Sequence, residues 1–335
     1  MSRRVKTRWL ALIAGTIAAL YGVNNSWSAA PPSGPRPLLA HRGVHQTFSR
    51  EGLTTETCTA AQSHPIRHRF IENTIPSMSE AFRLGATTVE IDVHPTTDGE
   101  FVVFHDWTLD CRTNGSGVTR RHTLAQIQAL DVGWGYTADG GRTYPLRGSG
   151  LGLAPSLEQV LREFPDRRFH INVKSNDPRE AELLDGWLDA RPWARPERLA
   201  VFGGPRPTAR LRALRPEMVT GSKGDLKACA RDYLLTGWTG RTPDRCRRQL
   251  VYVPAGWGWL LWGWPNRFVQ RMEAAGSEVW LIGPPDIENR ALPSLDDPAD
   301  LARALRRWKG GIATDRIEVI GPLVRQAEGA REGRS

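Results

Sequence analysis

The sequence predicts a single (β/α)8 barrel of the TIM type, in the α/β class, with loops inserted at the edge where the strands end. Two observations support this prediction. Short apolar runs alternate along the chain with segments of helical period, and such alternation is typical of a parallel sheet. The length of 335 residues suits one barrel, because barrels of this type exceed the size of an ordinary domain. Hydrophobic residues form 40% of the chain and charged residues 24%, which excludes a disordered chain and a multi-pass membrane protein.

Residues 1–30 have the pattern of a signal peptide or an N-terminal membrane anchor. Four basic residues precede an apolar run from Trp9 to Val23, and small residues follow it. The run is short for a spanning helix of about 20 residues, so cleavage and anchoring both stay open. In either case we expect export, to the periplasm or the medium. Loss of the four basic residues lowers the formal charge from +9 to +5, and we expect no nucleic-acid partner.

We expect a linker at 31–36, a barrel domain at 37–325 and a polar tail at 326–335. The first strand ends at His41, and two more run through Val89–Val93 and Phe101–His105. Asp98-Gly99 between the last two is a turn signal, which favours a tight connection over a full βαβ unit.

Further strand candidates follow at 169–173, 199–202, 219–221, 250–253, 279–282 and 311–314, with helical periodicity at 156–163, 180–190, 267–275 and 301–308. This makes nine strands for eight barrel positions. Short apolar runs are ambiguous by period alone, and we expect the surplus strand at Val219–Gly221 or Leu250–Val253.

Four polar motifs lie among the first strands, and all but the second come at the end of an apolar run. They are His41-Arg42-Gly43, Glu72-Asn73-Thr74, Glu90-Ile91-Asp92 and His105-Asp106. Because parallel strands of a barrel end at one edge, we expect these side chains to share that edge, the catalytic rim. Two imidazoles with several carboxylates indicate metal-assisted acid/base chemistry.

The four motifs in this order resemble the glycerophosphodiester phosphodiesterase family, and the resemblance runs from Pro37 to Thr314-Asp315. It implies a (β/α)8 barrel and metal-dependent hydrolysis of small glycerophosphodiesters to an alcohol and sn-glycerol 3-phosphate. It also implies that His41 and His105 are the acid/base pair. In the family, the substrate's own glycerol hydroxyl is thought to attack phosphorus, giving a cyclic phosphate that water then opens.

Glu90 and Asp92 lie one residue apart on a strand, so both carboxylates face the same side and can hold one hard cation, Ca²⁺ or Mg²⁺. Glu72 is a further candidate ligand or hydrogen-bond acceptor. Arg42 has the planar fork that suits phosphate oxygens. Lys174 matches the lysine of the family's strand-four I-E-I-K pattern and would place a second positive charge at the phosphate.

Asn172 departs from the family's pattern, which usually has a metal-binding carboxylate at this position. An amide oxygen can coordinate Ca²⁺ or Mg²⁺ but adds no charge. We expect weaker metal binding with activity retained. Two alternatives stay open: a lysophospholipase D-like enzyme acting on acylated lipids, and a non-catalytic phospholipid-binding barrel.

The chain has four cysteines, an even number that favours two disulfides in an exported protein and permits three pairings. Cys229 and Cys246 could close one short stretch. A bond between Cys58 and Cys111 would tie two loops together over the site. Free buried thiols remain the alternative.

Two insertions depart from a minimal barrel, one between Gly43 and Glu72 and one between Gly133 and Gly152. A third feature is the run at 253–264, which contains four of the 13 tryptophans: Trp257, Trp259, Trp262 and Trp264. Tryptophan is enriched where one side of a ring is apolar and the other wet, so this run could contact a membrane surface. The alternative is that it packs a barrel helix. The oligomeric state stays open.

Overall fold

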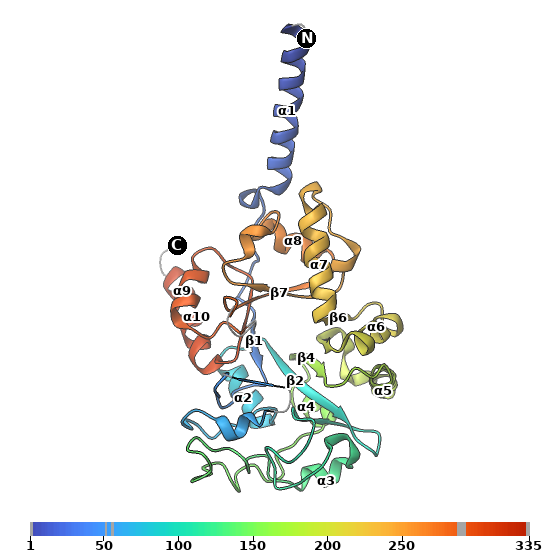
Figure 1. Cartoon of the computed structure of the whole chain (residues 1–335), viewed down its shortest axis with the longest axis vertical. Helices are drawn as coiled ribbons and strands as arrows, with labels where there is room; N and C mark the ends of the chain where they lie inside the picture. Colours follow the sequence, from blue (N-terminus) through green and yellow to red (C-terminus); the bar gives the residue numbers. More distant parts are fainter. Residues whose placement is uncertain (1–2, 51, 55–56, 287–292, 333–335) are drawn as a thin grey trace.

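The structure, a computed structural model, describes residues 3–50, 52–54, 57–286 and 293–332. Eight parallel strands form a nearly closed barrel with helices on its outside (Figure 1). The strands are β1 (Leu38–His41), β2 (Thr88–Pro95), β4 (Arg168–Val173), β5 (Leu199–Gly203), β6 (Val219–Ser222), β7 (Leu250–Pro254), β8 (Glu278–Ile282) and β9 (Gly311–Thr314). Their order is β6-β5-β4-β2-β1-β9-β8-β7. Between the two end strands, Thr220 N donates to Arg248 O at 3.0 Å, and the predicted TIM-type barrel is confirmed.

The ninth strand, β3 (Phe101–Val103), is antiparallel to β2 and lies outside the barrel order. The tight connection at Asp98-Gly99 is therefore confirmed, but the expectation that the surplus strand lay at 219–221 or 250–253 is wrong. Both of those runs are barrel strands. The physical reason is that β2 extends beyond its neighbours and β3 folds back along it, until Phe104 N donates to Asp92 O at 2.9 Å. The hairpin thereby returns the chain to the level of the barrel rim.

Most of the helices that follow β1 pack an apolar face against the outside of the barrel. The short helix at 124–128 packs instead in a separate apolar cluster that contains Val102 and Phe104. After β1 the helices are α2 (Ile75–Arg83), α3 (Leu124–Gln128), α4 (Leu157–Glu163), α5 (Arg179–Asp189), α6 (Pro205–Leu214), α7 (Lys223–Thr236), α8 (Asn266–Ala274), α9 (Pro298–Leu305) and α10 (Ile317–Glu332). The four helices expected from periodicity are all present. Helix α10 continues past Arg325, into the segment expected to be a polar tail.

The N-terminal helix α1 (Arg3–Asn24) projects away from the barrel (Figure 1). Its last turn is attached beside α8 and the short helix η6 (Gly237–Thr239). Arg271 Nη2 donates to Val23 O at 2.8 Å, and Asn24 Nδ2 donates to Trp238 O at 2.8 Å. Among the residues that the structure describes, no helix combines the length and apolar character needed to cross a bilayer.

A buried ion pair lies inside the barrel on strands β4 and β8. His170 Nε2 is 2.8 Å from Glu278 Oε2, and Arg168 pairs with the other oxygen of the same carboxylate. Burial raises the pKa of Glu278, but the neighbouring His170 and Arg168 outweigh burial and bring it down from 4.5 to about 2. The ionised carboxylate is therefore part of the folded structure.

Replacing this carboxylate tests its contribution to stability. Glu278→Gln is expected to lower the free energy of unfolding at pH 7 by about 3 kcal/mol. Because the folded-state pKa is depressed, this contribution is present above about pH 4.5 and is lost as the pH falls toward 2. Urea unfolding at pH 7 and pH 3 measures the difference between variant and wild type. The control is Glu182→Gln, in an exposed pair with Arg210 that contributes about 1 kcal/mol or less. A difference for Glu278→Gln that is independent of pH would contradict the assignment.

Candidate active site

The first motif histidine, His41, is the last residue of β1 and lies between two acidic groups. Its Nδ1 is 2.9 Å from Asp315 Oδ1, just after β9, and its Nε2 is 3.6 Å from Glu90 Oε2 on β2. Burial lowers the pKa of His41, but Glu90 and Asp315 outweigh burial and the pKa is raised overall. His41 in turn holds the pKa of Asp315 well below its usual range, against the effect of burial.

Asp92, also on β2, is fully buried and surrounded by donors. Its Oδ1 accepts hydrogen bonds from Asn172 Nδ2 and Lys174 Nζ, each at 3.1 Å. Its Oδ2 accepts from Asn73 Nδ2 at 2.9 Å and is 3.2 Å from Arg42 Nε. Burial raises the pKa of Asp92, but Lys174 and Arg42 together hold it well below its usual range. The structure therefore gathers Asp92, Asn172, Lys174 and Arg42 at one point.

Two motif residues owe their positions to an unusual backbone conformation. Arg42 has φ 57° and Asn73 has φ 59°, in a left-handed region that few residues other than glycine adopt. The two segments are joined by Asn73 N donating to Arg42 O at 3.0 Å. Gly43 follows with φ 81°, and a Cβ there would lie 2.3 Å from Ser77 Oγ. This close approach explains the glycine of the first motif.

His105 lies just beyond β3, where the hairpin returns to the rim. Its Nδ1 donates to Asp106 Oδ1 at 2.6 Å. Burial and the nearby Arg42 lower the pKa of His105, although Asp92 and Asp106 act in the opposite direction. Both motif histidines thus pair with a carboxylate, and both help to lower the pKa of Asp92, so their charges act at the same site.

Glu72 lies between two arginines. Arg42 Nη1 donates to its Oε1 at 2.9 Å, and Arg112 Nη1 is 3.0 Å from its Oε2. Burial raises the pKa of Glu72, but Arg112 and Arg42 outweigh burial and bring it to about 2. Both oxygens of this candidate metal ligand are therefore engaged by arginine.

Glu90 is the exception among the buried carboxylates of the rim. Its Oε2 is buried and has no hydrogen-bond partner among the residues that the structure describes. Burial and the neighbouring Asp92 raise the pKa of Glu90. A buried carboxylate oxygen of this kind fits a hard divalent cation. Glu90 thus has the chemistry that the predicted Ca²⁺ or Mg²⁺ needs, whereas the oxygens of Asp92 and Glu72 already contact amide or basic groups.

A second group of possible ligands includes one of the same histidines. Ligand atoms of His41, His45 and Asp315 all lie within 4.8 Å of one another. His45 Nδ1 is 2.9 Å from Gln46 O, and its Nε2 is buried without a hydrogen-bond partner in the described part of the chain. This nitrogen-rich set suits a transition metal better than Ca²⁺ or Mg²⁺.

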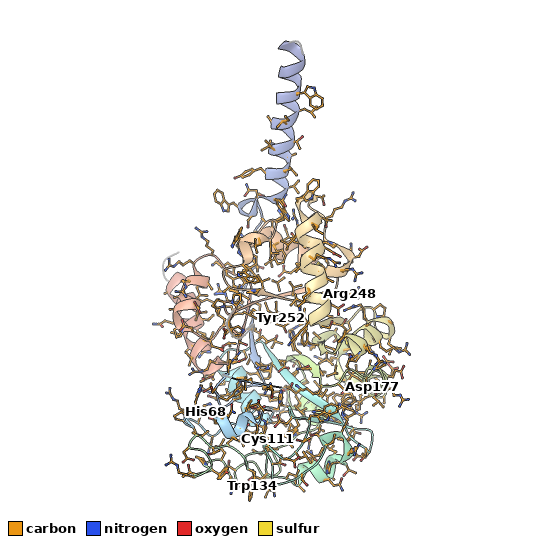
Figure 2. The ribbon with its side chains drawn as sticks, in the orientation of Figure 1. His68, Cys111, Trp134, Asp177, Arg248 and Tyr252 are labelled. Carbon is orange, nitrogen blue, oxygen red and sulfur yellow. A yellow bond between two sulfur atoms is a disulfide. The ribbon has the colours of Figure 1, made fainter. Side chains whose placement is uncertain are left out.

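Both disulfides suggested by the sequence are present, namely Cys58–Cys111 and Cys229–Cys246. The first joins the inserted loop before Glu72 to the loop after His105, close to the site. Cys111, and Trp134 from the second inserted segment, lie at the opposite end of the molecule from α1 (Figure 2).

Sequence reasoning gave no role to Asp106, Asp315, Arg112 or His45. Asp106 belongs to a recognised motif, and Asp315 follows an apolar strand as the motif residues do. The sequence therefore contained evidence for a role of both residues. For Arg112 the sequence contained none, because this is one of 45 basic residues and its partners are distant in sequence. His45 follows the first motif closely, but a lone histidine is weak evidence of function.

Comparison with known proteins finds similarity to one family over part of the chain. Residues 41–190 match the model of the Glycerophosphoryl diester phosphodiesterase family. A glycerophosphodiester phosphodiesterase of Caldanaerobacter subterraneus subsp. tengcongensis is 37% identical over 105 residues, which is 31% of this chain and 39% of that protein. One from Bacillus subtilis is 38% identical over 110 residues, 32% of this chain and 36% of the relative. The matches thus span well under half the length of these relatives.

Solved structures show the same fold over most of the chain. The glycerophosphoryl diester phosphodiesterase domain of an uncharacterized Mycobacterium tuberculosis protein has a TM-score of 0.59 at 16% identity, covering 88% of this chain and 100% of that one. An Oleispira antarctica phosphodiesterase in complex with the product sn-glycerol-3-phosphate has a TM-score of 0.53 at 17% identity, covering 90% and 99%. At these identities the similarity establishes the fold alone.

Proposed function

We propose that this chain, a member of the glycerophosphoryl diester phosphodiesterase family, hydrolyses small glycerophosphodiesters to an alcohol and sn-glycerol 3-phosphate. The observation that supports this best is the pairing of two histidines with carboxylates at one rim. His41 lies 2.9 Å from Asp315 and His105 lies 2.6 Å from Asp106. The relatives' names and the Oleispira product complex agree with this substrate class.

The reaction requires a general base, a general acid and positive charge at the phosphoryl oxygens, and these residues can supply all three. One histidine takes the proton of the attacking hydroxyl as the new P–O bond forms, and the other gives a proton to the departing alcohol oxygen as the old P–O bond breaks. Water opens the resulting cyclic phosphate by the reverse proton transfers. Arg42 and Lys174 would neutralise the phosphoryl oxygens. The carboxylates of Asp315 and Asp106 hold the two rings in orientation.

A divalent cation is part of the proposal. Glu90 would hold it, with Asp92 and Asn172 as further oxygen donors and Glu72 near by. Such an ion supplies charge stabilisation of the phosphoryl group when bound. Asn172 contributes a neutral oxygen, so this chain is expected to bind the ion less tightly than a relative with a carboxylate there.

The test is release of glycerol 3-phosphate from glycerophosphocholine by the purified chain. EDTA should abolish turnover, and Ca²⁺ or Mg²⁺ should restore it. His41→Ala and His105→Ala should each lower kcat by about 10²-fold or more, which is the usual contribution of general acid–base catalysis.

A substrate with a nitrophenol leaving group separates the two histidine roles, because this group departs without help from an acid. One of the two variants, and not both, should regain activity on it. The control is His122→Ala, whose Nδ1 contacts Val118 O outside the motif cluster. Full activity in both motif variants would contradict the proposed chemistry.

We also propose that the exported protein contacts a membrane surface through an apolar patch around the base of α1. The exposed large side chains there are Trp27, Leu234, Leu235, Trp238, Trp257, Trp259, Leu260 and Trp262. They are continuous, because Trp262 Nε1 donates to Leu234 O and Trp27, Trp259 and Trp262 line one groove. Trp259 is 76% exposed, which does not fit the alternative that this run packs a helix. Trp264, by contrast, stacks on Trp308 and is not part of the patch.

Sedimentation with vesicles containing phosphatidylglycerol tests this contact. Arg241 lies beside the patch and would favour an anionic surface. The double variant Trp259→Ser/Trp262→Ser of the full chain should lower vesicle partitioning by about thirtyfold, since each indole contributes about 1 kcal/mol at an interface. Trp134→Ser, an exposed tryptophan at the other end of the molecule, is the matched control. Equal partitioning of both variants would contradict the proposal.

A further inference from the structure

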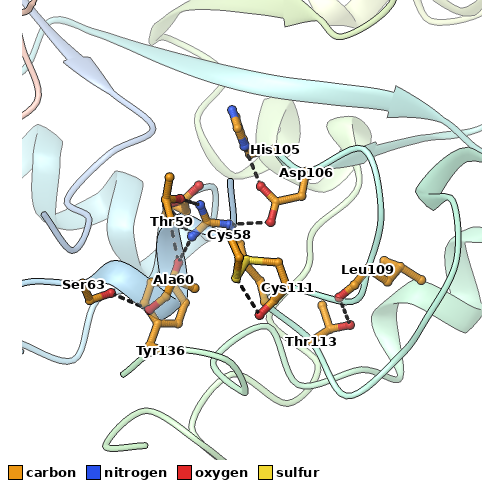
Figure 3. Close-up of a disulfide and its surroundings, with 12 residues drawn as sticks. Cys58, Thr59, Ala60, Ser63, His105, Asp106, Leu109, Cys111, Thr113 and Tyr136 are labelled. Atoms are coloured by element: carbon orange, nitrogen blue, oxygen red, sulfur yellow. Dashed lines mark hydrogen bonds and ion pairs between the residues drawn. A yellow bond between two sulfur atoms is a disulfide. The ribbon is translucent and has the colours of Figure 1, made fainter. Parts of the chain in front are cut away.

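The disulfide Cys58–Cys111 lies next to a buried arginine that connects both halves of the candidate site. Arg112, the residue after Cys111, is 2% exposed. Its Nε lies 2.9 Å from Asp106 Oδ2, and its Nη1 lies 3.0 Å from Glu72 Oε2. Figure 3 shows the disulfide beside the pair formed by His105 and Asp106. One guanidinium therefore spans two carboxylates that are distant in sequence.

Each of these carboxylates in turn holds a motif side chain. Asp106 accepts from His105 Nδ1 with its other oxygen, Oδ1. Glu72 accepts from Arg42 Nη1 with its other oxygen, Oε1. Arg112 thus contacts the carboxylate partner of His105, a proposed acid/base group, and the carboxylate partner of Arg42, a proposed phosphate-binding group. It acts through their partners and has no contact with the reacting atoms in this arrangement.

Both half-cystines contribute to holding Arg112. Cys111 precedes it in the chain, and Thr59, next to Cys58, accepts a hydrogen bond from its Nη2. On a third side, Arg112 Nη1 donates to Tyr136 Oη at 2.7 Å. Gly135 packs so closely on the disulfide loop that a Cβ there would lie 1.8 Å from Cys111 O. The bond therefore joins the two loops at the residues that supply the arginine and one of its partners.

We infer that the Cys58–Cys111 disulfide and Arg112 form a positioning unit that holds His105 and Arg42 in their working geometry, so that turnover requires this bond to be formed. The inference rests on the proposed function. It links full activity to an oxidising compartment, because the reduced chain would lose the constraint between the two loops. A displacement of about 1 Å at a catalytic group can cost about 10²-fold in rate.

The second disulfide is the matched control. Cys229 lies on α7, and Cys246 lies in the short helix η7 (Asp244–Cys246) on the outside of the barrel. The carbonyl of Cys246 accepts from Ser277 Oγ, a residue without a role in the proposed chemistry. Loss of the Cys229–Cys246 disulfide should lower the stability of the protein and leave the rate of the chemical step unchanged.

The experiment compares kcat, KM and melting temperature of the full chain in four forms. Cys58→Ala/Cys111→Ala should lower kcat by about 10²-fold with KM within about twofold, a pattern that a merely structural role would not give. Arg112→Lys, which keeps the charge but reaches one carboxylate, should lower kcat in the same direction. Cys229→Ala/Cys246→Ala should keep the wild-type kcat even where its melting temperature falls. Dithiothreitol should lower the kcat of wild type and of Cys229→Ala/Cys246→Ala, which both keep the Cys58–Cys111 bond. It should not lower the kcat of Cys58→Ala/Cys111→Ala further.

A readout without turnover separates this inference from the proposed function. The downfield proton resonance of His105 Nδ1–H bonded to Asp106, observed with ¹⁵N-labelled histidine, should be lost in Cys58→Ala/Cys111→Ala and retained in Cys229→Ala/Cys246→Ala. If wild type hydrolyses no diester but this resonance behaves as expected, the proposed function fails and the positioning unit stands. A folded Cys58→Ala/Cys111→Ala variant with wild-type kcat and an unchanged resonance would overturn the inference.

Discussion

The structure of the site depends on one constraint, the burial of several carboxylates at the end of a barrel. Glu72, Glu90 and Asp92 are all less than a tenth exposed, and a buried charge without a partner is costly. Arg42 and Lys174 pair with the buried charge of Asp92, and Arg112 pairs with that of Glu72. The left-handed backbone at Arg42 and Asn73 is the local cost of placing their side chains beside these acids.

The negative charge of Glu90 is not fully compensated by basic side chains. We propose that this uncompensated charge gives the site its affinity for a cation. The nearest basic neighbour of Glu90 is His41, at 3.6 Å, and one oxygen of Glu90 has no hydrogen bond among the described residues. Asn172 lowers the negative charge of the site by one relative to a carboxylate. The same substitution lets Lys174 and Asn172 share Asp92 Oδ1 as hydrogen-bond donors. Asp92 is therefore compensated by protein groups, and a bound cation would complete the charge balance at Glu90.

Most of the barrel could be predicted from the sequence, because its strands are short apolar runs separated by helical periods. The role of β3 could not, since an apolar run does not reveal whether the strand continues the barrel or folds back along its predecessor. Motif spacing predicted that His41, Glu90, Asp92 and His105 would meet. It could not show that Arg112 spans Glu72 and Asp106, because the three residues lie in separate segments that only the tertiary fold brings together. The exposure of Trp259 and the inward stacking of Trp264 likewise follow from tertiary packing, which local composition does not record.

We propose that the oxygen ligands around Glu90, and not the nitrogen-rich group of His41, His45 and Asp315, hold the cation. Calorimetric titration of Ca²⁺ and Mg²⁺ into wild type, Glu90→Gln and Asn172→Glu distinguishes the two sites. Glu90→Gln should abolish binding, and Asn172→Glu should tighten it by about tenfold, because a charged ligand replaces a neutral one. Binding that is unchanged in both variants, and is lost instead in His45→Ala, would contradict this proposal.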